Sequence, residues 1–293
     1  MIIVKLFGGV GNQMFQYAAG RSLALKNNCE LKLDITHFDT LILPNDLPYR
    51  SFDLSIFDLD PFLCTEEEIK KFNYNTNSFL EKGFRKVKNV FSKYTTVCEP
   101  YFHFYEDFLK NSGNVYIDGY WQSEKYFKHI EQIIRNDFKI KTTLNAEGLT
   151  ILEKIKNTNS VCVNIRRQEL ASNKYSTQFV GLDYLNNAIE AISKKEINPH
   201  FFIFSDELSW VKENIKIDYQ FTIVEESLYG DKYRDCLFLM SSCKHFIIPN
   251  STFGWWAAWL SGIEKKVVIT PNKWFTDNTK DTRDLIPEEW IKL

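Results

Sequence analysis

The stretch IIVKLFGGVGNQMFQYAAG, residues 2–20, indicates the fold of the N-terminal half. It begins with a short β-branched run that predicts a strand, followed by a glycine loop at residues 8–11. Apolar residues then recur at helical spacing to about Lys26, with Asn12 as the expected N-cap. Alternation over residues 30–35 predicts a second strand. A strand, loop, helix and strand in this order predict a parallel sheet with helices on its faces.

The C-terminal half alternates strands and helices more regularly. The expected strands cover residues 161–165, 200–204, 220–224, 245–248 and 266–270, and the expected helices cover 182–194, 209–214, 231–242 and 251–260. This alternation predicts right-handed βαβ units and a second doubly wound sheet. Residues 36–150 are less regular, with a helix expected near residues 126–136.

The predicted fold class is therefore α/β, with two Rossmann-like domains facing each other across a cleft in the GT-B architecture. We place the boundary in the polar stretch at residues 145–159, which gives an N-terminal domain of residues 1–155 and a C-terminal domain of residues 156–293. The last residues are expected to pack back on the N-terminal domain. A length of 293 residues is comfortable for two domains.

Composition and charge exclude several classes of protein. A net charge of −2 argues against a nucleic-acid binder, which needs a concentrated basic face. The basic stretch at residues 82–93 fits either a solvated helix face or attraction to an anionic membrane carrying a lipid-linked acceptor. The six cysteines have no metal-ligand spacing, no signal peptide opens the chain, and the apolar run at residues 253–263 is too short to span a bilayer. We expect a cytoplasmic protein, at most peripheral on the inner membrane.

Ligand-binding side chains are expected just beyond the carboxyl ends of the strands in the second sheet. These positions carry Asn164, Arg166, Arg167, Asp206, Glu225, Asn250, Ser251, Thr252 and Phe253. A guanidinium binds phosphate oxygens with two parallel hydrogen bonds, so Arg166 is a candidate to neutralise a departing diphosphate. The helix start at Ser251 offers backbone N–H groups to the same anion. Asp206 and Glu225 would accept hydrogen bonds from ribose hydroxyls or a guanine edge. Each feature also has a plain alternative, a surface ion pair or a helix cap.

Three other motifs are ambiguous. The glycine loop fits either a phosphate cradle or a tight turn, because it is not a P-loop and Met14 interrupts the dinucleotide-binding pattern. Asp58-Leu59-Asp60 matches an Asp-x-Asp metal motif but follows no buried strand, so no metal site is expected. The tryptophans around Trp256 favour packing between helix and sheet over a sugar platform.

Long motifs give the chain a resemblance to the bacterial α-1,2-fucosyltransferases of glycosyltransferase family eleven, nearly end to end. They are GGVGNQMFQYA at residues 8–18, DGYWQSEKYF at 118–127, Ser205-Asp206 with Trp210-Val211-Lys212, LMSSCKH at 239–245 and NSTFGWWAAWL at 250–260.

The resemblance implies a galactoside α-1,2-fucosyltransferase that moves L-fucose from GDP-β-L-fucose to a galactose 2-hydroxyl with inversion. No metal or other cofactor is implied. The partners are the GDP-sugar and a galactose-terminated or lipid-linked glycan of the bacterial surface, such as O-antigen or capsule. Arg166 would bind the β-phosphate, joined in binding or catalysis by residues of the glycine loop, namely Gly9, Gly11, Asn12 and Gln13.

The chain departs from the family motif at three positions. The chain has Asn164 where the motif has histidine, Gln168 where it has glycine and Glu169 where it has aspartate. Asparagine still forms hydrogen bonds but cannot be protonated. A second hypothesis is therefore a GT-B transferase whose sugar donor is another GDP- or UDP-hexose. A carbohydrate-binding protein without enzymatic activity is a third. Asp34 and Glu169 are the candidate general bases.

Overall fold

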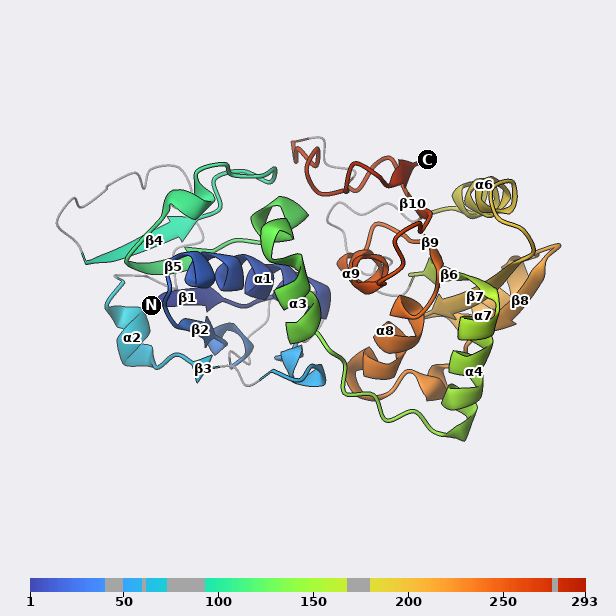
Figure 1. Cartoon of the computed structure of the whole chain (residues 1–293), viewed down its shortest axis with the longest axis horizontal. Coiled ribbons are helices and arrows are strands. Elements are labelled where there is room, and N and C mark those ends of the chain that lie inside the picture. Colours follow the sequence, from blue (N-terminus) through green and yellow to red (C-terminus); the bar gives the residue numbers. More distant parts are fainter. Residues whose placement is uncertain (40–49, 60–61, 73–92, 168–179, 276–278) are drawn as a thin grey trace.

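The computed structural model describes residues 1–39, 50–59, 62–72, 93–167, 180–275 and 279–293. Two parallel sheets lie side by side, each with helices around it (Figure 1). The two-domain α/β fold expected from the alternating pattern is therefore confirmed.

The first sheet is formed by the N-terminal part of the chain in the order β3-β2-β1-β5-β4, with every pair parallel. Its strands are β1 (Ile2–Lys5), β2 (Leu31–Asp34), β3 (Phe62–Leu63), β4 (Tyr94–Cys98) and β5 (Asn114–Asp118). The β-branched β1 is central, with Ile2 opposite both Leu31 and Val115. Its side chains are almost fully buried because neighbouring strands cover both edges and helices cover the faces.

Helix α1 (Val10–Lys26) begins earlier than the sequence suggested. Its N-cap is Gly9, so the prediction of Asn12 as the N-cap is wrong. Gly8 has φ +76°, a conformation that favours glycine and turns the chain sharply from β1 into the helix. Because the helix starts two residues before Asn12, the side chain of Asn12 is left available for contacts with other parts of the protein.

The second sheet has the order β11-β10-β9-β6-β7-β8, again entirely parallel. Its strands are β6 (Asn159–Ile165), β7 (Pro199–Ser205), β8 (Gln220–Ile223), β9 (His245–Ile247), β10 (Val268–Thr270) and β11 (Ile291–Lys292). The accompanying helices are α6 (Leu182–Ser193), α7 (Leu208–Asn214), α8 (Arg234–Ser241) and α9 (Thr252–Leu260). The five strands and four helices predicted here are confirmed, whereas the short edge strand β11 was not foreseen.

The polar stretch in which we predict the domain boundary forms a helix. Helix α4 (Ala146–Asn157) occupies most of the polar stretch at residues 145–159 and packs against β6 and α8. It is therefore part of the second domain, and the chain leaves the first domain before Ala146. The other described α-helices are α2 (Glu66–Lys70) and α3 (Glu131–Asp137), the latter shorter than the helix predicted near residues 126–136.

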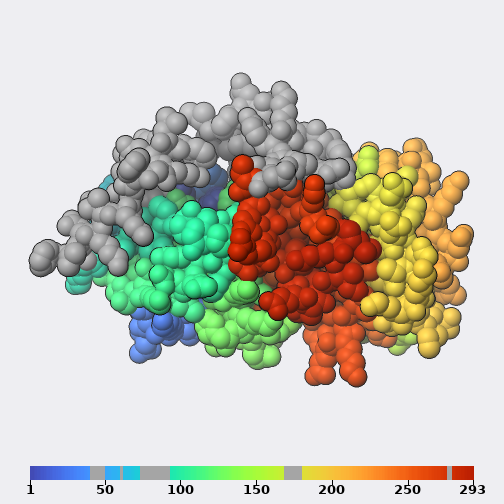
Figure 2. Space-filling model, turned by 90° about the horizontal axis from the view of Figure 1, so that it is seen from above, coloured from blue at the N-terminus to red at the C-terminus, as the bar shows by residue number. Residues whose placement is uncertain are grey.

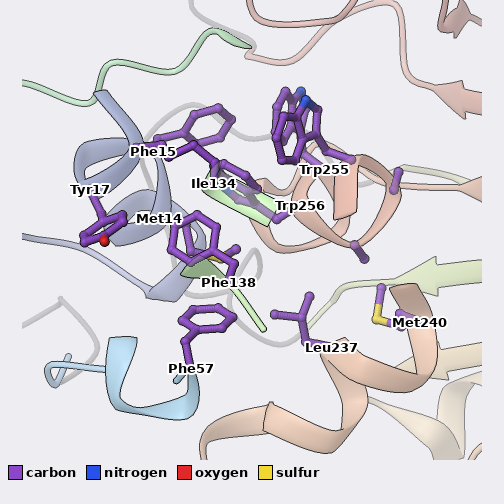
Figure 3. Packing of buried hydrophobic residues seen from close by; sticks show 14 of the residues in the cluster. Met14, Phe15, Tyr17, Phe57, Ile134, Phe138, Leu237, Met240, Trp255 and Trp256 are labelled. Atoms are coloured by element: carbon purple, nitrogen blue, oxygen red, sulfur yellow. The ribbon is translucent and has the colours of Figure 1, made fainter. Parts of the chain in front are cut away.

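The two domains share one apolar core, formed mainly where α1 meets α9 (Figure 3). The ring of Phe15 on α1 lies 4.5 Å from that of Trp255 and 4.9 Å from that of Trp256, between ring centroids. Trp255, Trp256 and Trp259 are all buried. The expectation that these tryptophans serve packing is confirmed, although they pack largely against a helix of the other domain.

The C-terminal segment also crosses between the domains. Asp284 accepts hydrogen bonds from the backbone N–H of Phe104 and from Lys125 Nζ, at 3.0 and 2.7 Å. Figure 2 shows this segment in red beside the teal part of the first domain. Within the part of the chain that the structure describes, no helix is long and apolar enough to cross a lipid bilayer.

Candidate functional site

The candidate site lies where the N-terminal ends of α1 and α9 meet. A Cβ atom on Gly11 would stand 2.6 Å from Thr252 Oγ1 and 2.8 Å from the backbone nitrogen of Phe253, so only glycine allows this approach. Asn12 Oδ1 accepts hydrogen bonds from Thr252 Oγ1 at 3.1 Å and from Gln122 Nε2 at 2.9 Å. The glycine loop of the first domain therefore lies directly against the Ser251 helix start of the second.

Arg166 extends into this junction from the end of β6. Its Nη1 donates a hydrogen bond to Ser251 Oγ at 2.9 Å. Burial, and then repulsion by the guanidinium of Arg50, lowers the pKa of Arg166 to about 10, and the attraction of Asp206 opposes the shift only in part. Arg166 is thus still a cation at neutral pH.

Arg167 points in another direction and contacts other residues than Arg166 does. Its Nε donates to Glu207 Oε2 at 3.1 Å, and its guanidinium lies 3.8 Å from the ring centroid of Trp210 on α7. Its backbone N–H donates a hydrogen bond to Asp206 Oδ1 at 2.7 Å, and this bond holds the turn after β6 in place. Arg166 alone of the two is bonded to the α9 helix start.

Arg50 is a residue that the sequence analysis missed. Its Nη1 lies 3.4 Å from the position that a Cβ on Gly9 would occupy, so it packs against the glycine loop. Burial lowers its pKa, opposed by the attraction of Asp53. Arg50 belongs to none of the motifs found in the sequence, so the sequence contains no local signal that would have identified it.

The remaining expected residues of the second sheet lie at different depths. Asn250 is buried and its Nδ2 donates to the backbone carbonyl of Trp274 at 2.9 Å. Asn164 is also buried, and its Oδ1 accepts no hydrogen bond from any described residue. Phe253, on the first turn of α9, is half-buried with its ring near that of Tyr233. Glu225 is exposed and forms an ion pair with Lys212 at 3.0 Å.

Gln13 and Asp34 are buried and engaged within the first domain. Gln13 is fully buried, and its amide contacts Gly8, Ser51 and Asp53, so it holds the segment that follows Arg50. Asp34, a candidate base, is 1% exposed and accepts hydrogen bonds from Thr36 and from the hydroxyl of Tyr116. The Asp34 carboxylate is therefore engaged inside the first domain, and its role as a base stays a prediction.

Some predicted positions lie outside the described residues. These are Gln168, the other candidate base Glu169, Asp60 of the Asp-x-Asp motif and residues 82–92 of the basic stretch. Asp58 is exposed and paired with Lys141 at 2.7 Å. Among the residues that the structure describes, no group of three or more His, Cys, Asp or Glu side chains is arranged to hold a metal ion.

The arrangement is suited to binding an anion. Arg50 and Arg166 approach the glycine loop from different domains, and the first turns of α1 and α9 add backbone N–H groups that lack partners within their helices. A phosphate or diphosphate would receive charge-assisted hydrogen bonds from both sources.

Comparisons with known proteins agree with this chemistry. The family described as Glycosyl transferase family 11 matches residues 1–293. The Escherichia coli α-1,2-colitosyltransferase is 29% identical over 100% of this chain and 99% of its own length. The Escherichia coli O-antigen biosynthesis glycosyltransferase WbnK is 32% identical over 98% of this chain and 99% of its own.

Solved structures of low identity share the fold. The fucosyltransferase NodZ from Bradyrhizobium aligns with a TM-score of 0.55 and 14% identity, over 92% of this chain and 94% of NodZ. The same enzyme, an α-1,6-fucosyltransferase, co-crystallised with GDP, aligns with a TM-score of 0.53 and 12% identity over the same shares. With two parallel α/β sheets and these structural neighbours, the chain has the GT-B architecture.

Proposed function

The chain belongs to glycosyl transferase family 11 and is a glycosyltransferase, and we propose that it transfers L-fucose from GDP-β-L-fucose to the 2-hydroxyl of a galactoside. The observation that carries this proposal is the position of Arg166, bonded to the α9 helix start beside the glycine loop of the first domain. That position suits a diphosphate leaving group, because a guanidinium and a helix start both bind phosphate oxygens.

The proposed reaction is a direct displacement with inversion. The oxygen of the acceptor hydroxyl forms the new bond to the anomeric carbon and its proton passes to solvent water, while the electron pair of the breaking C–O bond stays on the β-phosphate oxygen of GDP. Arg166 and the first turns of α1 and α9 stabilise the charge that grows there. We propose that this stabilisation needs no metal ion. We propose no general base, since Asp34 is buried.

Exchanging each arginine of the pair in turn tests the role of Arg166. Arg166→Ala is expected to lower transfer from GDP-fucose at least about 10²-fold, the usual effect of removing one preorganised charge stabiliser. Arg167→Ala is the matched comparison, because Arg167 contacts Glu207 and Trp210 instead of the helix start. We expect a smaller loss in that variant. Near-normal turnover in Arg166→Ala would refute the assignment.

A second candidate donor is GDP-colitose. It is favoured by the similarity of the whole chain to an α-1,2-colitosyltransferase. Colitose is fucose without its 3-hydroxyl, so a site that hydrogen-bonds this hydroxyl rejects the dideoxy sugar strongly, whereas a site that does not accepts both. Initial rates with GDP-fucose, GDP-colitose and a UDP-hexose, measured with EDTA present, separate these donors and test independence from metal.

For the acceptor, we propose a galactose-terminated glycan of the bacterial surface, met on the cytoplasmic side of the inner membrane. Similarity to an O-antigen biosynthesis glycosyltransferase supports this class. Linkage analysis by NMR of the product formed from galactose-terminated oligosaccharides tests it. A linkage to any hydroxyl other than the galactose 2-hydroxyl would contradict the proposed specificity.

A further inference from the structure

Arg50 and Arg166 belong to different domains, yet both border the glycine loop. Arg50 Nη1 lies 3.4 Å, and its guanidinium carbon 3.6 Å, from the position of a Cβ on Gly9. On the other side, Gly11 abuts Thr252, whose neighbour Ser251 accepts the hydrogen bond from Arg166. The loop is therefore flanked by one guanidinium from each domain.

The backbone that carries Arg50 is fixed from both domains. The buried Gln13 donates to the carbonyl of Ser51 at 2.8 Å and accepts from the N–H of Asp53 at 2.9 Å. From the second domain, Lys232 Nζ donates to the carbonyl of Phe52 at 2.6 Å. Three bonds within three residues hold this segment, so the position of Arg50 beside the loop is preorganised rather than incidental.

The two guanidiniums are close enough to repel each other. After burial, the charge of Arg50 is the largest cause of the lowered pKa of Arg166. Each guanidinium is also attracted by a carboxylate, Arg50 by Asp53 and Arg166 by Asp206. Two like charges held together at a partly buried junction are stabilised when an anion lies between them.

We propose that Arg50 is a second diphosphate-binding residue, which acts from the N-terminal domain opposite Arg166 so that the phosphates of the nucleotide sugar join the two domains. This inference rests on the proposed function and extends its site to a residue outside the family motif. When the anomeric bond breaks, the diphosphate gains one negative charge, and Arg50 shares in neutralising it. Arg50 thus contributes to both nucleotide binding and departure of the leaving group.

Calorimetric titration of the whole protein with GDP and with guanosine tests the role of Arg50. Arg50→Ala is expected to weaken GDP binding about ten- to a hundredfold, the usual range for charge-assisted hydrogen bonds, and to leave guanosine binding unchanged. The matched control is Arg21→Ala. Arg21 pairs with Asp137 at 2.9 Å and lies about 18 Å along α1 from Gly9, at 1.5 Å per residue. This variant should bind GDP as the wild type does.

Thermal unfolding without ligand separates a binding role from a structural one. Relative to its own unliganded midpoint, the rise that GDP causes should be smaller in Arg50→Ala than in the wild type, whereas a purely structural role would lower the unliganded midpoint and leave this rise unchanged. If Arg50→Ala fails to fold, Arg50→Lys replaces it in the test. A lysine cannot form the paired hydrogen bonds of a guanidinium, so this variant should also bind GDP more weakly than the wild type.

The outcomes distinguish this inference from the proposed function. A wild-type protein that binds no GDP would overturn the proposed function itself. A wild type that binds GDP, together with Arg50 variants of unchanged GDP affinity, would overturn only the role of Arg50. An equal loss of GDP and guanosine binding would assign Arg50 a structural role instead.

Discussion

Replacing Gly11 by alanine should separate the two domains at the point where the candidate site is assembled. The new Cβ would lie 2.6 Å from Thr252 Oγ1, 2.7 Å from the carbonyl carbon of Thr252 and 2.8 Å from the nitrogen of Phe253. Two of these three atoms belong to the backbone, so a side-chain rotation cannot relieve the clash. The start of α9 must shift away from α1.

The expected loss in the free energy of unfolding follows from the contacts that this shift disturbs. Inserting a methyl group into a packed junction costs about 1–3 kcal/mol. The shift also strains two hydrogen bonds, from Trp256 Nε1 to the Gly11 carbonyl at 3.0 Å and from Thr252 Oγ1 to Asn12 at 3.1 Å. Each contributes about 0.5–1.5 kcal/mol. We therefore expect Gly11→Ala to lower the free energy of unfolding by about 2–6 kcal/mol.

Urea unfolding followed by tryptophan fluorescence measures this effect, since Trp255, Trp256 and Trp259 are buried at the junction. The matched control is Gly262→Ala, because no atom of the described residues, apart from the two chain neighbours, lies within 4 Å of the position of its Cβ. Alanine there should change stability by less than about 1 kcal/mol. Equal midpoints for the two variants would refute the close approach of α1 and α9. Gly11→Ala should also lose affinity for GDP, which Gly262→Ala should retain.

Two further predictions concern stability and pH. Burial, and then repulsion by Arg135, lowers the pKa of Lys266 to about 8. The folded state thus releases a proton that the unfolded state keeps, so stability should rise from about pH 8 to 10. Lys266→Met should flatten this rise, and an unchanged slope would contradict the prediction. Burial by itself would raise the pKa of Asp235, but hydrogen bonds from Arg234, Thr142 and Thr143 lower it. This stabilisation is present above the unfolded pKa and is lost as the pH falls through the folded one. Asp235→Asn should therefore cost about 1.5–3 kcal/mol at pH 7 and progressively less as the pH falls below the unfolded pKa of this carboxyl, as measured by urea midpoints; a cost independent of pH would argue against an ionic role.

The sequence determined most of the fold because the relevant signals are local. The β-branched run before the glycine loop and the apolar strands of the second half require only near neighbours to be recognised. The same patterns placed Arg166 at a strand end, where open α/β sheets bind ligands. The elements β11 and α4 were not predicted. β11 has only two residues, and α4 lies in a polar stretch that resembles a linker.

Tertiary structure decided which of these residues share a site. Nothing in the sequence around Arg50 distinguishes it from other arginines, and bonds from Gln13 and Lys232 hold its segment beside the glycine loop. The Arg166-Arg167 pair looked alike in sequence, yet the turn after β6 sends one side chain to Ser251 and the other to Glu207. The physical reason is that periodicity specifies an element and its buried face, whereas the convergence of residues far apart in the chain depends on which faces pack together. In this protein, the packing of α1 against α9 brings the residues of the candidate site together.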